Sequence, residues 1–223
     1  MNDEAKRRAA QAALNEVPES GIIGLGTGST VKFFVDALAD VVRGGRRLTG
    51  VCTSQATRKH ADELGIPLLD DAGPWPIEVT IDGADEVAES PWLALSKGGG
   101  GALTREKIVA FASRRFVVIC DSSKKVSRLG ATRPLALEVL EFGHLETMKR
   151  LEAFGKPVLR QSARTDAGNL LVDLEVAPIA DPTALDRALD AIPGIVETGL
   201  FLGMASVVYV AHEDRIERLV ASS

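Results

Sequence analysis

The chain has 223 residues, of which 45% are hydrophobic and 26% charged, so it can bury the core of one large domain or of a domain with a smaller partner. Its formal net charge of −5 argues against a nucleic-acid-binding protein, because phosphate backbones favour basic surfaces. The N-terminus has no apolar signal segment, no apolar run is long enough to cross a bilayer, and Cys52 and Cys120 form no CxxC pair. We therefore expect a cytoplasmic protein that binds neither nucleic acid nor a membrane.

The first two thirds of the chain alternate short apolar runs with amphipathic segments. Helices are expected over residues 4–16, 30–42, 55–64 and 104–113, and strands over residues 22–25, 48–52, 78–81 and 116–120. Strands that alternate with helices in this way indicate a parallel sheet covered on both faces.

The pattern then changes, and two strand-like runs accompany each helix. This is typical of a small α+β module of the split-βαβ type. A further apolar run follows near the C-terminus. The sequence thus predicts an α/β protein whose main domain, residues 1–129 and 207–223, is interrupted by a small α+β domain, residues 130–206.

The first motif with chemical content is GLGTGST, which follows a strand and opens a helix. Its glycines allow a tight turn, Thr27, Ser29 and Thr30 add hydroxyl donors, and the free N–H groups of the new helix complete an anion site. A dinucleotide fingerprint would need a glycine in place of Ser29, and the motif lacks the lysine of a P-loop. The alternative is an ordinary glycine-rich turn, but the clustered hydroxyls favour a phosphate.

The second motif is DGADE, which follows the apolar strand EVTI. Ligands of parallel sheets bind at the carboxyl ends of the strands, so Asp82 and Asp85 could both face a small polyol. The alternative is a solvated acidic turn in which Asp85 caps a helix.

The third motif is KGGGGALTREK. Four consecutive glycines cost conformational entropy, which suggests a backbone that must wrap closely around a ligand. Lys97 stands at the start of this loop, and Glu106 lies in the first turn of the following helix. The alternative is that Lys97 is solvated and that Glu106 only complements the helix dipole. A fourth segment, DSSKKV, places Lys124 and Lys125 after a strand, where one of them could reach a phosphate.

These segments together could hold a phosphate, bind the hydroxyls of a polyol, and supply one cation and one carboxylate base. An aldose–ketose isomerisation through an enediolate needs this set, because one base can move the proton between neighbouring carbons while a cation stabilises the negative oxygen. The histidines, His60, His144 and His212, form no ligand pair in the sequence. We therefore expect no metal and no cofactor.

In this order and spacing, GLGTGST, DGADE, KGGGGALTREK and DSSK resemble the type A ribose-5-phosphate isomerases. The resemblance extends nearly end to end and includes TSQATRKHADELGIPL, TDAGNLLVD and AIPGIVETGLF. It implies a Rossmann-like main domain with a ferredoxin-like insert. It also implies a homodimer or homotetramer that interconverts D-ribose 5-phosphate and D-ribulose 5-phosphate.

The resemblance further implies a role for each motif. Glu106 would be the proton shuttle and Lys97 would stabilise the enediolate oxygen, while Asp82 and Asp85 would hold the sugar hydroxyls and assist ring opening. The remaining residues implied to contact the substrate are Thr27, Gly28, Ser29, Thr30, Gly83, Ala84, Gly98, Gly99, Gly100 and Lys124.

Three other classes compete with this interpretation. An amino-sugar-phosphate deaminase or a sugar-phosphate lactonase would be expected to use a histidine, and none lies in or beside the four motifs in the sequence. A non-catalytic sugar-phosphate sensor would have lost its base, whereas Glu106 and Lys97 are both present. A nicotinamide-dependent dehydrogenase is disfavoured by the broken fingerprint.

Overall fold

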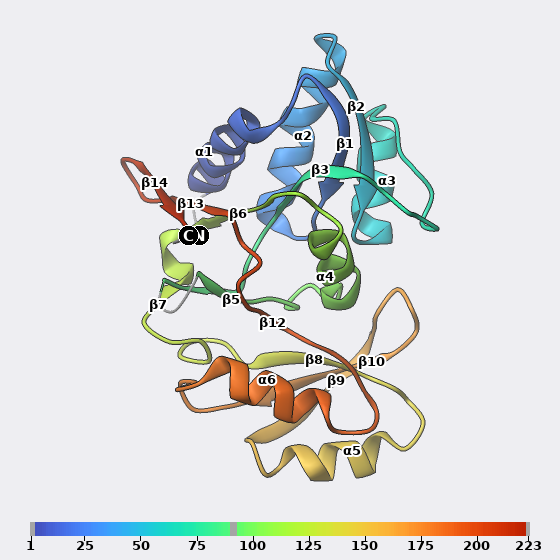
Figure 1. Ribbon diagram of the computed structural model, residues 1–223, viewed down its shortest axis with the longest axis vertical. Coiled ribbons are helices and arrows are strands. Elements are labelled where there is room, and N and C mark those ends of the chain that lie inside the picture. The colour runs from blue at the N-terminus through green and yellow to red at the C-terminus, as the bar shows by residue number, and fades with distance from the viewer. Residues whose placement is uncertain (1–2, 90–92, 222–223) are drawn as a thin grey trace. The chain divides into compact units, whose positions relative to one another are not determined.

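A computed structural model describes residues 3–89 and 93–221, and the chain forms two compact units (Figure 1). Unit 1 comprises Met1–Gly83, Arg105–Ser123 and Met204–Ser223, and unit 2 comprises Ala84–Thr104 and Lys124–Gly203. The chain therefore passes from one unit to the other several times, and each unit has its own core.

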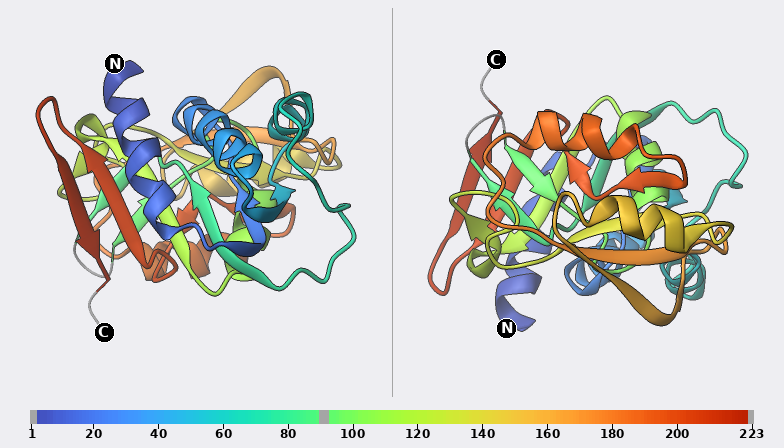
Figure 2. Two further views of the ribbon diagram at one scale, coloured as in Figure 1. Left: turned by 90° about the horizontal axis from the view of Figure 1, so that it is seen from above. Right: turned by 90° about the horizontal axis from the view of Figure 1, so that it is seen from below.

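Unit 1 is built on a six-stranded sheet in the order β14-β13-β6-β3-β1-β2, within the residues that the structure describes. Its strands are β1 (Ser20–Leu25), β2 (Arg47–Cys52), β3 (Ile77–Asp82), β6 (Phe116–Asp121), β13 (Val207–Ala211) and β14 (Ile216–Val220). All neighbours pair in parallel except β13 and β14, the antiparallel pair drawn in red at one edge in Figure 2. The parallel sheet expected from the alternating pattern is confirmed.

Helices pack on both faces of this sheet. They are α1 (Asp3–Ala13), α2 (Ser29–Arg43), α3 (Gln55–Glu63) and α4 (Leu103–Phe111), whose first two residues belong to unit 2. Residues of α1, α2 and α3 share one apolar core with the strands, and Val109 of α4 packs on Val51 and Ile77 in a second cluster. The strands are apolar along their length because both faces are covered.

The order of the strands places two predicted motifs side by side. In the sheet, β2 lies on one side of β1, and β3, which follows β2 in the chain, lies on the other side of β1. Such a reversal opens a crevice at the carboxyl ends of the two diverging strands, where α/β proteins bind ligands. The GLGTGST loop follows β1 and the DGADE turn follows β3, so both lie at this point.

Unit 2 contains a four-stranded sheet in the order β11-β8-β10-β9 in the described part of the chain. Its elements are β8 (Leu135–Val139), α5 (His144–Leu151), β9 (Lys156–Arg164), β10 (Leu170–Glu175), α6 (Pro182–Asp190) and β11 (Ile195–Thr198). Leu151 of α5 and Leu189 of α6 join one core with the strands, and Figure 2 shows both helices beside each other in its right view. The βαββαβ order confirms the ferredoxin-like insert.

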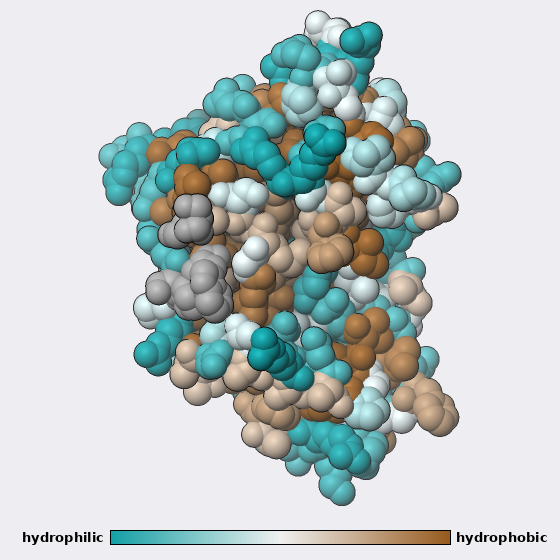
Figure 3. All heavy atoms as spheres, viewed as in Figure 1, coloured by the Kyte–Doolittle hydropathy of each residue, from teal (hydrophilic) through white to brown (hydrophobic). Residues whose placement is uncertain are grey.

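The outer face of α5 carries several charged side chains, together with the exposed Leu145. Its exposed residues include Glu146, Lys149 and Arg150, with an ion pair from Arg150 to Glu146 one turn away, and the foot of the view in Figure 3 is accordingly hydrophilic. The amphipathic pattern of this helix therefore matches its packing, with one apolar stripe on the sheet and charges in water.

Unit 2 also holds a small sheet that the sequence did not indicate. It has the order β12-β5-β4-β7, formed by β4 (Glu86–Ala88), β5 (Ala94–Ser96), β7 (Lys125–Val126) and β12 (Leu200–Phe201). These strands of two or three residues are too short to show a period. Because they pair with one another, residues 84–104 belong to unit 2, whereas the predicted division placed them in the main domain.

The other predicted elements agree with the structure to within a few residues, with one exception. The sequence pattern predicts no strand over the segment RIERLV, but Ile216–Val220 is an edge strand that pairs with β13. A short helix and a strand of five residues cannot be told apart by periodicity alone. None of the helices in the described residues is long and apolar enough to cross a membrane.

Candidate active site

The loop after β1 opens helix α2 and forms one wall of a pocket. Gly28, with φ of 119°, precedes the first helical residue, Ser29, and both are exposed, while no side chain of the N-cap bonds to the start of α2. A pocket of about 400 Å³ is lined by Thr27, Gly28, Ser29, Lys32, Thr57 and His60 among others. An open helix N-terminus beside a basic side chain is a favourable place for an anion.

Thr27 is held in this loop by other hydroxyl groups. Its Oγ1 lies 2.7 Å from Oγ1 of Thr53 and donates to Oγ of Ser54 at 2.9 Å, and the Thr57 hydroxyl donates to the carbonyl of Gly26 at 2.8 Å. Ser54 also caps α3 by accepting from the Thr57 N–H. At least one of the hydroxyls in the predicted phosphate loop therefore also holds the loop in its conformation.

Asp82 joins the two loops at the carboxyl ends of β1 and β3. Its side chain is completely buried, and Oδ1 accepts hydrogen bonds from the N–H of Thr27 at 3.0 Å and of Gly83 at 2.7 Å. A Cβ on Gly26 would lie 2.1 Å from the same oxygen, so only glycine fits there. This carboxylate therefore sets the shape of the crevice between the neighbouring strand ends.

In unit 2, Asp85 supports the tetraglycine loop, Gly98–Gly101. Its Oδ2 accepts from the N–H of Gly99 at 2.7 Å, and a strand, β4, follows it directly. The alternative in which Asp85 caps a helix is therefore wrong. Gly98 has φ of 106°, and a Cβ there would lie 2.7 Å from that of Ala136, so the loop needs glycine at this position.

Lys97 is buried, with only 3% of the residue exposed. Its backbone N–H donates to the carbonyl of Gly199 at 2.8 Å, and Nζ lies 5.5 Å from the centre of the Phe201 ring, within cation–π distance. The alternative of a solvated lysine is therefore wrong. A buried ammonium is costly unless its surroundings compensate, which makes it a candidate functional group.

Glu106 is also buried, with 4% of the residue exposed, in the first turn of α4. Both residues before it are held by side chains. Thr104 donates to Glu138 Oε2 at 2.5 Å within unit 2, and Arg105 pairs with Asp71 at 2.7 Å within unit 1. Glu106 is therefore not a solvated helix-end charge, and the turn that carries it is fixed.

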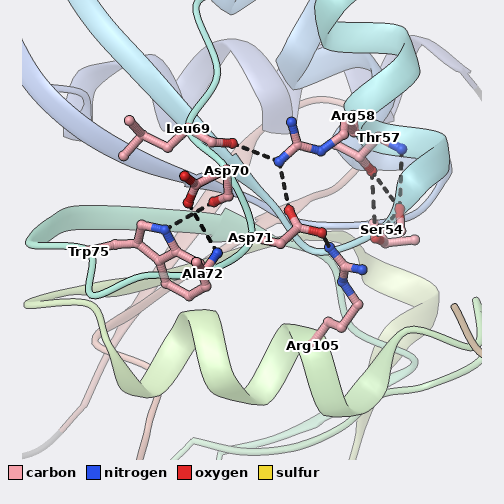
Figure 4. A network of polar contacts seen from close by, with 10 residues as sticks. Ser54, Thr57, Arg58, Leu69, Asp70, Asp71, Ala72, Trp75 and Arg105 are labelled. Carbon is pink, nitrogen blue, oxygen red and sulfur yellow. Dashed lines mark hydrogen bonds and ion pairs between the residues drawn. The ribbon is translucent and has the colours of Figure 1, made fainter. Parts of the chain in front are cut away.

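Figure 4 shows the contacts of Asp71 in unit 1, which sequence reasoning did not find. Arg58 of α3 donates to this carboxylate at 2.6 Å and Arg105 of α4 donates at 2.7 Å, so Asp71 ties both helices to the loop between α3 and β3. Burial raises the pKa of Asp71, but the hydrogen bonds from Arg105 and Arg58 outweigh it and hold the pKa below its usual range. An isolated acidic pair in a loop gives no sequence signal of such a partner.

Glu138 is a second residue that sequence reasoning missed. It is 2% exposed on β8 and accepts hydrogen bonds from Thr104 and from Thr165 at 2.9 Å and Asn169 at 2.7 Å. Only the pattern of PLALEV could have indicated this residue, because a strand there would place a charged side chain on its buried face.

Replacement of Glu138 with Ala should lower the free energy of unfolding by about 2–4 kcal/mol, because it leaves three polar side chains without their acceptor. The matched control is Glu141→Ala three residues on, which removes an exposed ion pair with Arg164 and should lower the free energy of unfolding much less. Urea unfolding of both variants measures the difference, and equal losses would contradict this account of Glu138.

Lys124 ends a short 3-10 helix, Ser122–Lys124, and is half-buried, while its neighbour Lys125 pairs with Glu89 at 2.6 Å. Before them, Asp121 is buried at the end of β6 and accepts from the Ser123 N–H at 3.0 Å. The ion pair of Lys125 leaves Lys124 as the better candidate for a substrate contact.

The histidines need one correction. None lies beside the motifs in the sequence, but His60 of α3 lines the pocket next to Thr27, and its Nε2 lies 2.7 Å from Asp36 Oδ1. The fold brings α3 beside the start of α2, which the sequence separation hides. Among the described residues, no group of three or more His, Cys, Asp or Glu side chains could hold a metal ion.

Cys52 is unsuited to nucleophilic catalysis. Burial raises the pKa of its thiol to about 11, although Arg58 acts in the opposite direction. At pH 8 only about one thiol in a thousand is then ionised, so iodoacetamide should leave Cys52 unmodified in the folded protein and alkylate it in urea. Peptide mass spectrometry measures this, and fast alkylation of the folded protein would contradict it.

An open helix N-terminus at the reversal of a parallel sheet is typical of α/β proteins that bind a small anionic ligand there. A family model for Ribose 5-phosphate isomerase A (phosphoriboisomerase A) matches residues 49–215. The chain belongs to this family.

Relatives and solved structures agree over nearly the whole length. The Ribose-5-phosphate isomerase A of Gloeobacter violaceus is 48% identical, with 99% of this chain and 98% of the relative covered, and that of Roseiflexus castenholzii is 48% identical over 96% and 94%. The ribose 5-phosphate isomerase A structure from Methanocaldococcus jannaschii has a TM-score of 0.93 and 34% identity, covering 99% and 100%. A D-ribose-5-phosphate isomerase in complex with phospho-erythronic acid has a TM-score of 0.94 and 35% identity, covering 99% of this chain and 100% of that one.

Proposed function

We propose that this protein interconverts D-ribose 5-phosphate and D-ribulose 5-phosphate through an enediolate. The proposal is carried by one observation. This chain belongs to the family, and its KGGGGALTREK motif holds a buried ammonium, Lys97, and a buried carboxylate, Glu106. The reaction needs one base and one stabilising cation, and both groups are of the required type.

In the proposed reaction, Glu106 removes the proton from C2 of the open-chain aldose. The electron pair forms the C1–C2 double bond, and the carbonyl oxygen O1 becomes negative beside the Lys97 ammonium. Glu106 then returns the proton to C1 on the same face, while the hydroxyl proton moves from O2 to O1, which leaves a carbonyl at C2. Atoms and charge balance without an external oxidant, so the reaction requires no cofactor.

The remaining contacts follow the chemistry of each motif. Thr27, Gly28, Ser29 and Thr30 bind the phosphate at the N-terminus of α2, together with the cation of Lys124. Asp82, Gly83, Ala84 and Asp85 hold the sugar hydroxyls and assist ring opening, and Lys97, Gly98, Gly99 and Gly100 surround the reacting end.

The ligand of one relative supports the assignment of the reacting end. Phospho-erythronic acid, bound in a structure 35% identical to this chain, is a phosphorylated sugar acid. Its planar, negatively charged carboxylate resembles an enediolate, so a site that stabilises the enediolate should also hold this acid. We expect it to inhibit this protein in competition with ribose 5-phosphate.

We propose that the protein is cytoplasmic and forms a homodimer or homotetramer. The two cysteines, Cys52 and Cys120, are both buried and free, which suits a reducing compartment. Large apolar side chains lie exposed in each unit, with Phe111 86% exposed in unit 1 and Phe142 95% exposed in unit 2. Clusters of exposed apolar side chains commonly mark subunit interfaces.

The test is an assay of the purified protein for ribulose 5-phosphate formed from ribose 5-phosphate in the presence of EDTA. Turnover unaffected by the chelator supports an isomerase that uses a side-chain base and a lysine. Tight binding of ribose 5-phosphate by calorimetry without any turnover would overturn the proposal and favour a non-catalytic sugar-phosphate sensor.

A further inference from the structure

Arg160 of β9 contacts the backbone of the tetraglycine loop within unit 2. Its Nη1 donates to the carbonyl of Gly98 at 2.9 Å and to that of Gly99 at 3.2 Å. These carbonyls follow directly on Lys97, so the guanidinium lies against the part of the loop that begins at the buried lysine.

Asp173 on the neighbouring strand β10 orients this guanidinium. Arg160 Nε donates to one carboxylate oxygen at 2.7 Å and Nη2 donates to the other at 2.6 Å. The pair is largely shielded, with side chains 20% and 23% exposed. Because the planar fork is fixed by two parallel hydrogen bonds, the third nitrogen can point only toward the loop, which a lysine could not reproduce.

The peptide groups of the loop are thereby held from two sides. The N–H of Gly99 donates to Asp85, and the carbonyl of Gly99 accepts from Arg160. Glycine has more backbone conformations to lose than any other residue, so a run of four needs such contacts to keep one shape. Asp85 comes from the DGADE motif, whereas Arg160 lies outside every motif that the sequence indicated.

We propose that Arg160, oriented by Asp173, is a positioning residue that keeps the tetraglycine loop and Lys97 preorganised for the developing negative charge. This role rests on the proposed isomerase function and adds Arg160 and Asp173 to the residues that support the reaction. Preorganised dipoles and charges stabilise a transition state because they do not have to reorient during the reaction, so loosening the loop should lower kcat more than it raises KM.

The test compares Arg160→Lys and Asp173→Asn with Lys156→Gln. Lys156 pairs with Glu175 across the same two strands but is 73% exposed, so it serves as a matched control. Hydrogen exchange of peptides spanning residues 97–102 reports the loop, and steady-state kinetics with ribose 5-phosphate report the reaction. Asp173→Asn keeps the arginine and gives a graded result should Arg160→Lys lose its fold.

We expect both loop variants to exchange these amides about 10-fold faster or more, since a hydrogen bond to a charged donor is lost or misaligned. We also expect kcat to fall about 10–100-fold, as for other displacements of about 1 Å at a reacting centre. Lys156→Gln should match wild type in both amide exchange and kcat.

Unchanged amide exchange in the loop variants would show that Arg160 does not hold the tetraglycine loop. Faster exchange with unchanged kcat would overturn the positioning role. A wild type without turnover would overturn the proposed function, while the exchange data would still decide whether Arg160 holds the loop.

Discussion

Replacement of Glu106 with Gln is expected to lower kcat by about 10²–10⁴-fold or more, with little change in KM. The carboxamide has the shape of the carboxylate and keeps the packing of this buried position, but it cannot accept the proton from C2. Because Thr104 and Arg105 hold the turn, the variant should fold as wild type does. Turnover of ribose 5-phosphate and binding of phospho-erythronic acid, measured separately, distinguish lost chemistry from lost binding.

Proton transfer can also be followed directly. In heavy water, wild type should incorporate deuterium at C1 of ribulose 5-phosphate to the extent that the shuttled proton exchanges with solvent. Glu106→Gln should form labelled product more slowly by the same factor as its loss of kcat. Glu63→Gln, at the exposed end of α3, is the control and should retain full activity. Substantial turnover by Glu106→Gln would remove Glu106 from the mechanism and require another base.

The second large effect is expected at Lys97. Lys97→Met should lower kcat by about 10²–10³-fold, the usual loss when one group that stabilises an oxyanion is removed. Methionine fills nearly the same volume beside Phe201 and needs no solvation, so the variant should remain folded. If Lys97 were purely structural, Lys97→Met would not give a stably folded protein with a low kcat.

The control for Lys97 is Lys156→Met, which removes a lysine that is mostly in water on β9. Thermal unfolding should show both variants folded at the assay temperature, and only Lys97→Met should be slow. If both variants kept wild-type kcat, the stabilising charge would have to come from another donor, and the amides of the tetraglycine loop would be the next to examine.

Local signals in the sequence predicted the fold class correctly. The alternation of strands and helices depends on periods of two and 3.6 residues, which are visible in any short window. The βαββαβ order of the second unit followed from the same rule. The strands that were missed, such as β4 and β12, are too short to show a period, and Ile216–Val220 is recognisable as a strand only by its pairing with β13.

The positions of side chains in the site were harder to predict. In β9 the exposed and half-buried residues follow no clear alternation, so nothing local indicated that Arg160 would face Gly98 and Asp173. His60 lies more than thirty residues from Thr27 in the chain, and only the packing of α3 against α2 places it at the same pocket. Contacts of this kind depend on strand register and helix packing between distant segments.

The sequence by itself determined which chemical groups the protein has and where each stands relative to a strand or a helix. GLGTGST, DGADE and KGGGGALTREK carry those groups because a glycine turn or a helix start is a property of a few neighbouring residues. The tertiary structure alone decided that Lys97 and Glu106 are buried, that Asp82 joins two loops, and that Glu138 and Arg160 support the motifs. Burial and hydrogen bonding depend on segments far apart in the chain, and they turn a lysine and a glutamate of ordinary type into candidates for catalysis.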